Sequence, residues 1–209
     1  QVFRTTRKAG LVRDDVELTH IGFGTMNGKD GKPFKTRDGG VMRLENMISD
    51  IADEMYKKIT ENHTVDPEEA KKTAKIVGLA ALKYGDLSNQ ASKDYVFDMD
   101  RFTSFEGNTG PYLLYSIVRI KSILAKYAET GKNINDYEIL PPTNKSQKDL
   151  MLALSSFQSV IETAANEYAP HKLCAYIYEL ANKFNHFYHE TKIMAEEDEK
   201  LQGSYFQLL

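Results

Sequence analysis

Cysteine is almost absent from this sequence. Cys174 is the only one in 209 residues, so the chain cannot form an internal disulfide. Such a composition fits a reducing compartment, and the apolar residues around Cys174 predict a buried thiol. No run approaches the roughly 18 apolar residues of a membrane span, and the start QVFRTTRKAG lacks the apolar centre of a signal peptide. We therefore expect a cytoplasmic protein without a membrane partner.

An excess of charge of either sign is also missing. The sequence has 27 Lys and Arg against 30 Asp and Glu, a formal net charge of −3. Nucleic-acid-binding proteins are often basic overall, so any RNA-binding surface here must be local, and we expect no DNA partner. The chain has no initiating Met and starts like the end of a helix, which indicates a piece of a longer protein.

The first half of the chain mixes two hydrophobic patterns. Alternation over residues 14–24, and a short apolar stretch within 94–101, predict strands. Helical spacing predicts one helix over 41–62 and a second that begins at Asp66-Pro67, a helix-capping pair, and ends near Gly85. We expect residues 1–105 to form a mixed α/β domain or part of one.

After Pro111 nearly every pattern has the period of a helix. Predicted helices cover 111–129, 148–167 and 170–194, with Phe184 and Phe187 in the core of the bundle. The acidic residues 196–200 are expected to be solvated. We therefore place an all-α domain over residues 106–209 and expect the chain to be mostly helical overall.

The stretch GKDGKPFKTRDGG, residues 28–40, is a cationic loop. Residues 28–43 hold five Lys and Arg against two Asp, which is a local charge of +3. Glycines and cations that follow a strand can hold phosphate, and ligands of α/β sheets bind beyond the carboxyl ends of strands. Asp30-Gly31 is equally a turn signal, typical of a solvated hairpin. Neither a P-loop nor a dinucleotide-binding spacing is present, so the residues leave both interpretations open.

Tyr112, Tyr115 and Arg119 lie at i, i+3 and i+7, and therefore on one side of the helix that starts at Pro111. Such residues often pack at a domain seam, with the tyrosines half-buried and the arginine paired to a carboxylate. They also suit RNA, where rings stack on unpaired bases and a guanidinium binds a phosphate or a base edge. The spacing alone favours packing at a seam, because tyrosine is common there.

Three longer stretches resemble the arginyl-tRNA synthetase family of bacterial type. They are THIGFGTMNGKDGKPFKTRDGGVMRLENMISDIADE, ALKYGDLSNQASKDYVFDMDRFTSFEGNTGPYLLYSIVRIKSIL and PHKLCAYIYELANKFNHFYHE. The resemblance extends to about Thr191. It implies the C-terminal part of an α/β class I (Rossmann-like) catalytic domain, followed by an all-α, helical-bundle anticodon-binding domain. The implied reaction is the ATP-dependent attachment of L-arginine to its tRNA in protein synthesis.

The resemblance also assigns site residues. FKTR, residues 34–37, stands where other class I synthetases carry the KMSKS signature, which implies the catalytic residues Lys35, Thr36 and Arg37, with Lys35 on the ATP phosphates. The residues implied near the adenine and ribose of ATP are His20, Gly22, Phe23 and Gly24. Those implied to meet the anticodon loop are Tyr112, Tyr115, Arg119 and Tyr188. Mg²⁺ is expected to bind mainly through ATP, with no metal site on the protein.

The sequence departs from the family pattern in two places. HIGF, residues 20–23, begins like the class I signature H-x-G-H but ends in Phe23, and no H-x-G-H occurs in the chain. We therefore expect that signature upstream and this chain to be inactive alone. After Thr191 the sequence stops before the last helix of the family's domain, so residues 170–194 are expected to expose apolar side chains. The alternative to a ligase is a non-catalytic tRNA-binding module.

His186 and His189, followed by Glu190, also share a helix face. Two imidazoles without the spacing of a known zinc motif are weak evidence for a metal site. Histidines near a helix end are more often explained by the helix dipole. We expect no metal site there.

Overall fold

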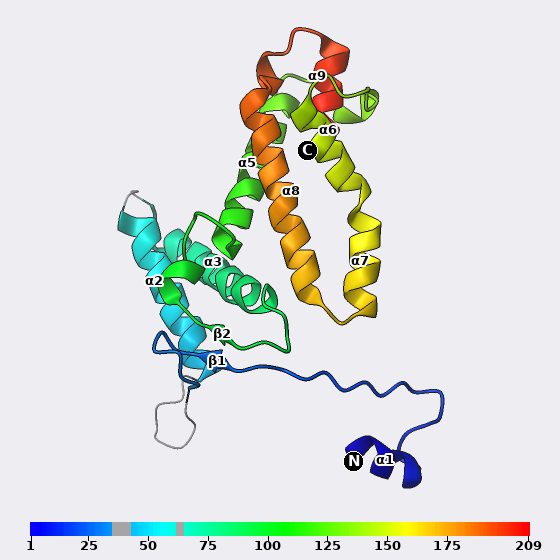
Figure 1. Cartoon of the computed structure of the whole chain (residues 1–209). Coiled ribbons are helices and arrows are strands. Elements are labelled where there is room, and N and C mark those ends of the chain that lie inside the picture. The colour runs from blue at the N-terminus through cyan, green and yellow to red at the C-terminus, as the bar shows by residue number, and fades with distance from the viewer. Residues whose placement is uncertain (35–42, 62–64) are drawn as a thin grey trace.

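The computed structural model describes residues 1–34, 43–61 and 65–209. In the first half, α2 (Leu44–Glu61) and α3 (Pro67–Leu87) pack against each other, and the short α4 (Met99–Phe102) follows. These bounds confirm the predicted helix over 41–62, as far as it is described, and the helix after Asp66. Figure 1 shows α1 (Val2–Lys8) at the end of an extended segment, away from the other helices.

Local sequence explains where α3 begins. The Asp66 side chain accepts hydrogen bonds from the backbone N–H groups of Glu68 and Glu69 at 3.0 and 3.1 Å, and Pro67 occupies the first turn, where no N–H is needed. Small residues then let α2 approach closely. A Cβ added to Gly78 would lie only 3.2 Å from the Ala52 backbone. The helix pair is therefore specified by a cap and by side-chain size.

The predicted strand over residues 14–24 is wrong. That segment is irregular, and the only strands in the described residues are β1 (Met26–Asn27) and β2 (Tyr95–Val96), which pair in parallel. Alternation marks a segment with two different faces, but a strand also needs a hydrogen-bonded neighbour. Asp98 ends the second predicted strand early, because its carboxylate caps α4.

The second half is a helical bundle, as predicted (Figure 1). Its helices are α5 (Gly110–Ala128), α6 (Lys145–Ser155), α7 (Phe157–Asn166), α8 (Pro170–Glu190) and α9 (Glu199–Phe206), with short 3₁₀ turns η1 (Ile134–Asp136) and η2 (Ile193–Ala195). α8 contacts α5, α6 and α7. The buried core includes Tyr127, Leu150, Phe184, Phe187 and Phe206, so Phe184 and Phe187 are in the core as expected.

The single helix predicted over 148–167 is two helices, α6 and α7. They separate at Ser156, where the carbonyl oxygen of Ala153 accepts hydrogen bonds from the Ser156 hydroxyl at 2.7 Å and from the Tyr176 hydroxyl at 2.9 Å. Side-chain donors that take a helix carbonyl compete with the helical ladder. One of these donors comes from α8, and so the break is invisible to local periodicity.

α9 was not predicted, and it changes the expectation for α8. Its residues Tyr205 and Phe206 are buried against Phe187 and Tyr127, so Phe187 of α8 is covered rather than exposed. The acidic residues 196–200 are mostly exposed, as expected. Asp198 among them caps α9 by accepting from two backbone N–H groups.

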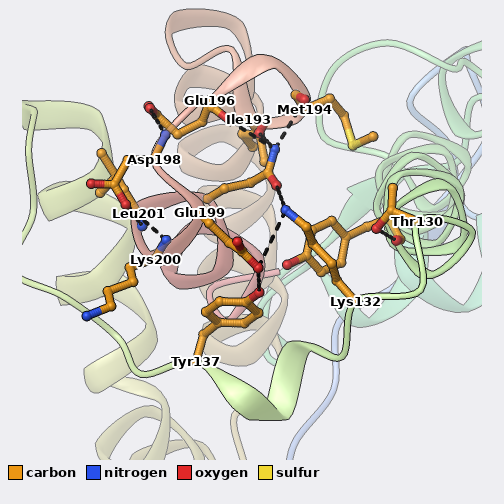
Figure 2. A network of polar contacts seen from close by, with 12 residues as sticks. Thr130, Lys132, Tyr137, Ile193, Met194, Glu196, Asp198, Glu199, Lys200 and Leu201 are labelled. Carbon is orange, nitrogen blue, oxygen red and sulfur yellow. Dashed lines mark hydrogen bonds and ion pairs between the residues drawn. The ribbon is translucent and has the colours of Figure 1, made fainter.

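A polar network joins α9 to the preceding loops (Figure 2). The Gln202 amide donates to three backbone carbonyls at 3.2–3.3 Å, those of Ile193, Met194 and Glu196. The Tyr137 hydroxyl donates to the Glu199 carboxylate at 2.5 Å, a bond that raises the pKa of Tyr137. These contacts hold the C-terminal helix to segments that would otherwise have unpaired polar groups.

The seam between the two halves lies where α5 begins against α3. A Cβ added to Gly110 would lie 2.4 Å from the carbonyl oxygen of Ala80. Nearby, the buried Tyr84 hydroxyl lies 2.9 Å from the carbonyl oxygen of Cys174 on α8, and burial raises the pKa of Tyr84. Cys174 is itself buried, as predicted. The start of α5 is thus held by close backbone contact.

We expect Gly110→Ala to lower the free energy of unfolding by about 1–3 kcal/mol, because the new methyl group must push two backbones apart. The urea unfolding transition of the chain measures this. Gly22→Ala is the matched control, since a Cβ there meets nothing within 4 Å. Equal unfolding midpoints for the two variants would contradict the tight contact.

Candidate nucleic-acid interface and cationic loop

Four predicted residues come together on one surface of α5 and α8. We call this surface the tyrosine–arginine face, and it consists of Tyr112, Tyr115, Arg119 and Tyr188. The Arg119 guanidinium carbon lies 4.9 Å from the ring centroid of Tyr115 and 5.4 Å from that of Tyr188. Tyr115 is 52% exposed, and Tyr112 and Tyr188 are half-buried. A cation placed over two ring faces is stabilised by their quadrupoles.

Two asparagines of α8 complete this face. Asn185 Oδ1 accepts from Arg119 Nη1 at 2.6 Å, and Asn185 Nδ2 donates to the Tyr112 hydroxyl at 2.8 Å. The Tyr112 hydroxyl in turn donates to Asn182 Oδ1 at 2.7 Å. Sequence reasoning missed both asparagines. The available signal was the spacing of Tyr178, Asn182 and Asn185, which places them on one side of α8.

The seam alternative holds for part of the face only. Tyr112 packs edge-on against Tyr178, with ring centroids 5.7 Å apart. This is the packing role predicted for a half-buried tyrosine at a seam. In the described ranges of the chain, however, no carboxylate forms an ion pair with Arg119. Its second guanidinium nitrogen donates to the Tyr115 hydroxyl at 3.2 Å. The surface therefore keeps a positive charge between an exposed ring and a half-exposed one.

The segment predicted to lie near a nucleotide is mostly exposed. His20, Gly22 and Phe23 are exposed, and Phe23 is 87% accessible. Gly24 is different: its N–H donates to the carbonyl of Ala91 at 2.8 Å, and a Cβ there would lie 2.3 Å from the Lys93 backbone. Two grooves flank this segment. Phe23 and Gly24 line one, and His20 and Gly22 line the other.

Lys35, Thr36 and Arg37, the predicted catalytic residues, lie outside the described residues. The loop that leads to them begins as a hairpin. The Gly31 N–H donates to the Gly28 carbonyl at 2.9 Å, and the Gly28 N–H donates to the Lys32 carbonyl at 2.9 Å. Gly31 has φ +73°, a value that favours glycine. The turn predicted at Asp30-Gly31 is therefore present.

Lys29 is committed to ion pairs at the base of this loop. Its ammonium lies 2.7 Å from an Asp100 oxygen and 3.0 Å from an Asp98 oxygen, and the hydrogen bond to Asp100, followed by that to Asp98, raises the pKa of Lys29. Phe34 packs against the cluster formed by α2, α3 and α4. The described part of the loop is anchored at both ends, and the charge of Lys29 is neutralised there.

Neither a grouped set of metal ligands nor a membrane-spanning helix occurs in the described residues. Within residues 1–34, 43–61 and 65–209, no three His, Cys, Asp or Glu side chains are grouped so as to hold a metal ion. His186 Nδ1 lies 3.3 Å from a Glu190 oxygen, which is a helix-surface pair. None of the helices that the structure describes combines the length and apolarity needed to cross a membrane.

Two family models match the chain in the order of its halves. Residues 1–99 match the catalytic domain of class I (R) tRNA synthetases, and residues 113–208 match the DALR anticodon binding domain. By family the chain therefore belongs to the class I aminoacyl-tRNA synthetases, with a match to their catalytic domain before a match to an anticodon-binding domain. The models leave residues 100–112 unassigned, and the boundary between 105 and 106 stays a prediction.

Curated relatives identify the particular family. The chain is 64% identical over 217 residues to an arginine–tRNA ligase of Agathobacter rectalis, an alignment that covers 100% of the chain and 36% of the relative. It is 53% identical over 209 residues to that of Alkaliphilus oremlandii, covering 100% of the chain and 35% of the relative. The chain spans about a third of the length of these relatives. It belongs to the arginyl-tRNA synthetase family and corresponds to a C-terminal portion, which confirms the resemblance seen in the sequence.

Solved structures support the fold. An arginyl-tRNA synthetase from Plasmodium falciparum superimposes with a TM-score of 0.74 at 24% identity, over 99% of this chain and 34% of that one. The enzyme from Thermus thermophilus gives 0.70 at 24% identity, over 90% and 31%. At such identity the likeness concerns the fold alone. The predicted fold class, a mostly helical C-terminal portion of a class I synthetase, is confirmed.

Proposed function

We propose that the protein to which this chain belongs is an arginine–tRNA ligase, which attaches L-arginine to its tRNA at the expense of ATP in the cytoplasm. The observation that carries the proposal is the tyrosine–arginine face, where Arg119, without a carboxylate partner in the described residues, lies between the rings of Tyr115 and Tyr188. Tyr115, Arg119 and Tyr188 lie within residues 113–208, which match the anticodon-binding domain, and Tyr112 directly precedes them.

On the RNA side, the face suits an unpaired loop. Bases of a single-stranded loop turn outward, where they stack on aromatic rings and on guanidinium planes. Tyr115 offers an exposed ring, and Arg119 retains N–H donors that are not used by Asn185 or Tyr115. Such a surface binds loop bases and nearby phosphates at the same time.

On the ATP side, the proposed chemistry needs no protein nucleophile. The carboxylate of arginine attacks the α-phosphate of ATP, and pyrophosphate leaves. Lys35, Thr36 and Arg37 are proposed to act on the leaving pyrophosphate, where positive charge stabilises the transition state. His20, Gly22, Phe23 and Gly24 are proposed to lie near the adenine and ribose. The groove beside Phe23 and Gly24 supports this placement.

Mg²⁺ would accompany ATP rather than occupy a protein cage. This ion binds mainly through substrate phosphates and keeps several waters, and the described residues offer no three-carboxylate cluster that would hold it otherwise. When bound, it would neutralise charge on the phosphates. The chain contains no H-x-G-H, so we expect adenylate formation only together with the remainder of such a ligase.

Binding of an arginine tRNA transcript tests the RNA side. We expect Tyr115→Ala to weaken binding by about 5- to 150-fold, since a stacked base contributes roughly 1–3 kcal/mol. Arg119→Ala should weaken binding to a similar degree. If the guanidinium contacts a phosphate, the Arg119→Ala substitution should also reduce the slope of log affinity against log salt by about 0.7–0.9. Filter binding at several salt concentrations measures both effects.

Ile117→Ala is the control for these variants. Ile117 is half-exposed on α5, and two residues along a helix turn the side chain by about 200° away from Tyr115. Affinity should therefore stay at the parent value. The RNA face would be rejected if Tyr115→Ala and Arg119→Ala bound the transcript with parent affinity and parent salt dependence.

A further inference from the structure

Asn185 lies at the centre of the tyrosine–arginine face, where it contacts two of the four side chains that define the face. Its side-chain amide, half-buried between α5 and α8, contacts three groups of α5, namely Arg119 Nη1 at 2.6 Å, the Tyr112 hydroxyl at 2.8 Å and Ser116 Oγ at 3.3 Å. We propose that Asn185 is a positioning residue that fixes Arg119 and Tyr112 for RNA while leaving the positive charge of Arg119 uncompensated. This inference rests on the proposed function of the face.

The hydrogen-bond chemistry determines the orientation of the amide. A guanidinium only donates, so the group of Asn185 that faces Arg119 is the oxygen. The NH₂ group must then face the Tyr112 hydroxyl and Ser116 Oγ. Because Tyr112 accepts from Asn185, its own proton is directed to Asn182 Oδ1, 2.7 Å away. The hydrogen bonds therefore run in one direction, from Asn185 through the Tyr112 hydroxyl to Asn182.

This orientation has a consequence at the surface. The oxygen of Asn182 is used by Tyr112, so the exposed Asn182 presents its NH₂ group. The Tyr115 hydroxyl accepts from Arg119 and therefore has its own proton to donate. Asn185 thus orients Asn182 through Tyr112, and Arg119 leaves the Tyr115 hydroxyl with a proton to donate, so both side chains offer donors, which suits the acceptor-rich surface of RNA.

An amide at this position has a property that a carboxylate lacks. Aspartate has nearly the same shape and would bind Arg119 more strongly, because an ionised acceptor strengthens the hydrogen bond. It would also neutralise the guanidinium that is proposed to meet a phosphate. Asparagine holds the same nitrogen at hydrogen-bond distance and carries no charge. In the part of the chain that the structure describes, no ion pair removes the charge of Arg119 in another way.

The test compares Asn185→Asp with Asn185→Leu in the complete chain of the protein, with an arginine tRNA transcript as the probe. Both variants should weaken binding by about 10- to 100-fold. Asn185→Asp neutralises the charge that Arg119 offers to a phosphate, and Asn185→Leu removes the hydrogen bonds that hold Arg119 in place. Only Asn185→Asp should reduce the slope of log affinity against log salt, by about 0.7–0.9, because only it neutralises one phosphate-binding cation. Asn185→Leu should keep the parent slope.

Two controls separate this effect from others. Asn166→Asp adds the same charge at an exposed position on α7, and it should leave affinity and slope within about twofold of the parent, since separated surface charges are screened. Circular dichroism of each variant verifies the helical content. In the Arg119→Ala background, Asn185→Asp should produce no further change of slope, because the cation it would neutralise is gone.

Each possible result supports or contradicts the positioning role of Asn185. Equal affinities and equal salt slopes for Asn185→Asp and Asn185→Leu would show that Asn185 has only a structural role, and parent-like binding by Asn185→Asp would overturn the inference as well. If Arg119→Ala itself binds like the parent, the RNA face fails as a whole. If Arg119→Ala weakens binding while Asn185→Asp does not, the face stands and the role of Asn185 is wrong.

Discussion

Replacement of Lys35 by alanine in the complete ligase is expected to slow ATP–pyrophosphate exchange by about 10²- to 10³-fold, the usual effect of removing one preorganised charge or donor from a transition state. The affinity for arginine should change much less, since Lys35 is proposed to act on the leaving pyrophosphate. Exchange of labelled pyrophosphate at saturating arginine measures the rate. The dependence of that rate on arginine concentration gives the affinity for arginine.

Lys32→Ala is the matched control for this variant. Lys32 belongs to the same cationic loop, where its backbone closes the hairpin with Gly28 and Asp30. Lys29 is a poor control, because it forms ion pairs with Asp98 and Asp100 and its loss would disturb the loop. Lys32→Ala should retain an exchange rate within a few-fold of the parent. Unchanged exchange in Lys35→Ala would remove this lysine from the proposed mechanism.

Phe206→Ala should lower the free energy of unfolding by about 3–5 kcal/mol, the usual cost of deleting a buried aromatic ring. Phe206 is 1% exposed and stacks on Tyr127 with ring centroids 3.8 Å apart. Its loss would leave a cavity where α9 meets α5, and the rigid ring of Tyr127 would lose its stacking partner. Urea unfolding of the 209-residue chain, followed by circular dichroism, measures the effect.

Phe157→Ala provides the comparison, because Phe157 is 52% exposed on α7. Its removal should cost well under half as much as that of Phe206, since a half-exposed ring transfers less apolar surface out of water. If the two variants unfolded at the same urea concentration, α9 would not belong to the core of the bundle.

The helices that sequence predicted well are those whose signals are local. α2, α3 and α5 follow from periodic apolar residues, and α3 and α5 also have a cap or a proline at the start. The elements that were wrong depend on distant partners. Residues 14–24 alternate as a strand does, yet in the described chain they form no strand and pair with none. The break at Ser156 involves the Tyr176 hydroxyl from another helix.

The residues of the candidate site also differ in whether local sequence or distant contacts define them. The spacing of Tyr112, Tyr115 and Arg119 was readable because three residues share one helix face. Tyr188 came only from the family resemblance, and Asn185 was missed, because neither lies near the others in the sequence. Whether Arg119 pairs with a carboxylate or an amide is likewise a property of two packed helices. The RNA-binding role of these residues stays a prediction.

The sequence by itself determined the family, the positions of most helices and the single helix face that carries two tyrosines and an arginine, since each is written in local order and spacing. Tertiary structure alone decided that α9 closes the bundle core, that Lys29 is neutralised by Asp98 and Asp100, and that an uncharged amide holds Arg119. The physical reason is that burial and charge compensation depend on which side chains meet across elements, and residue spacing along one element does not contain that information.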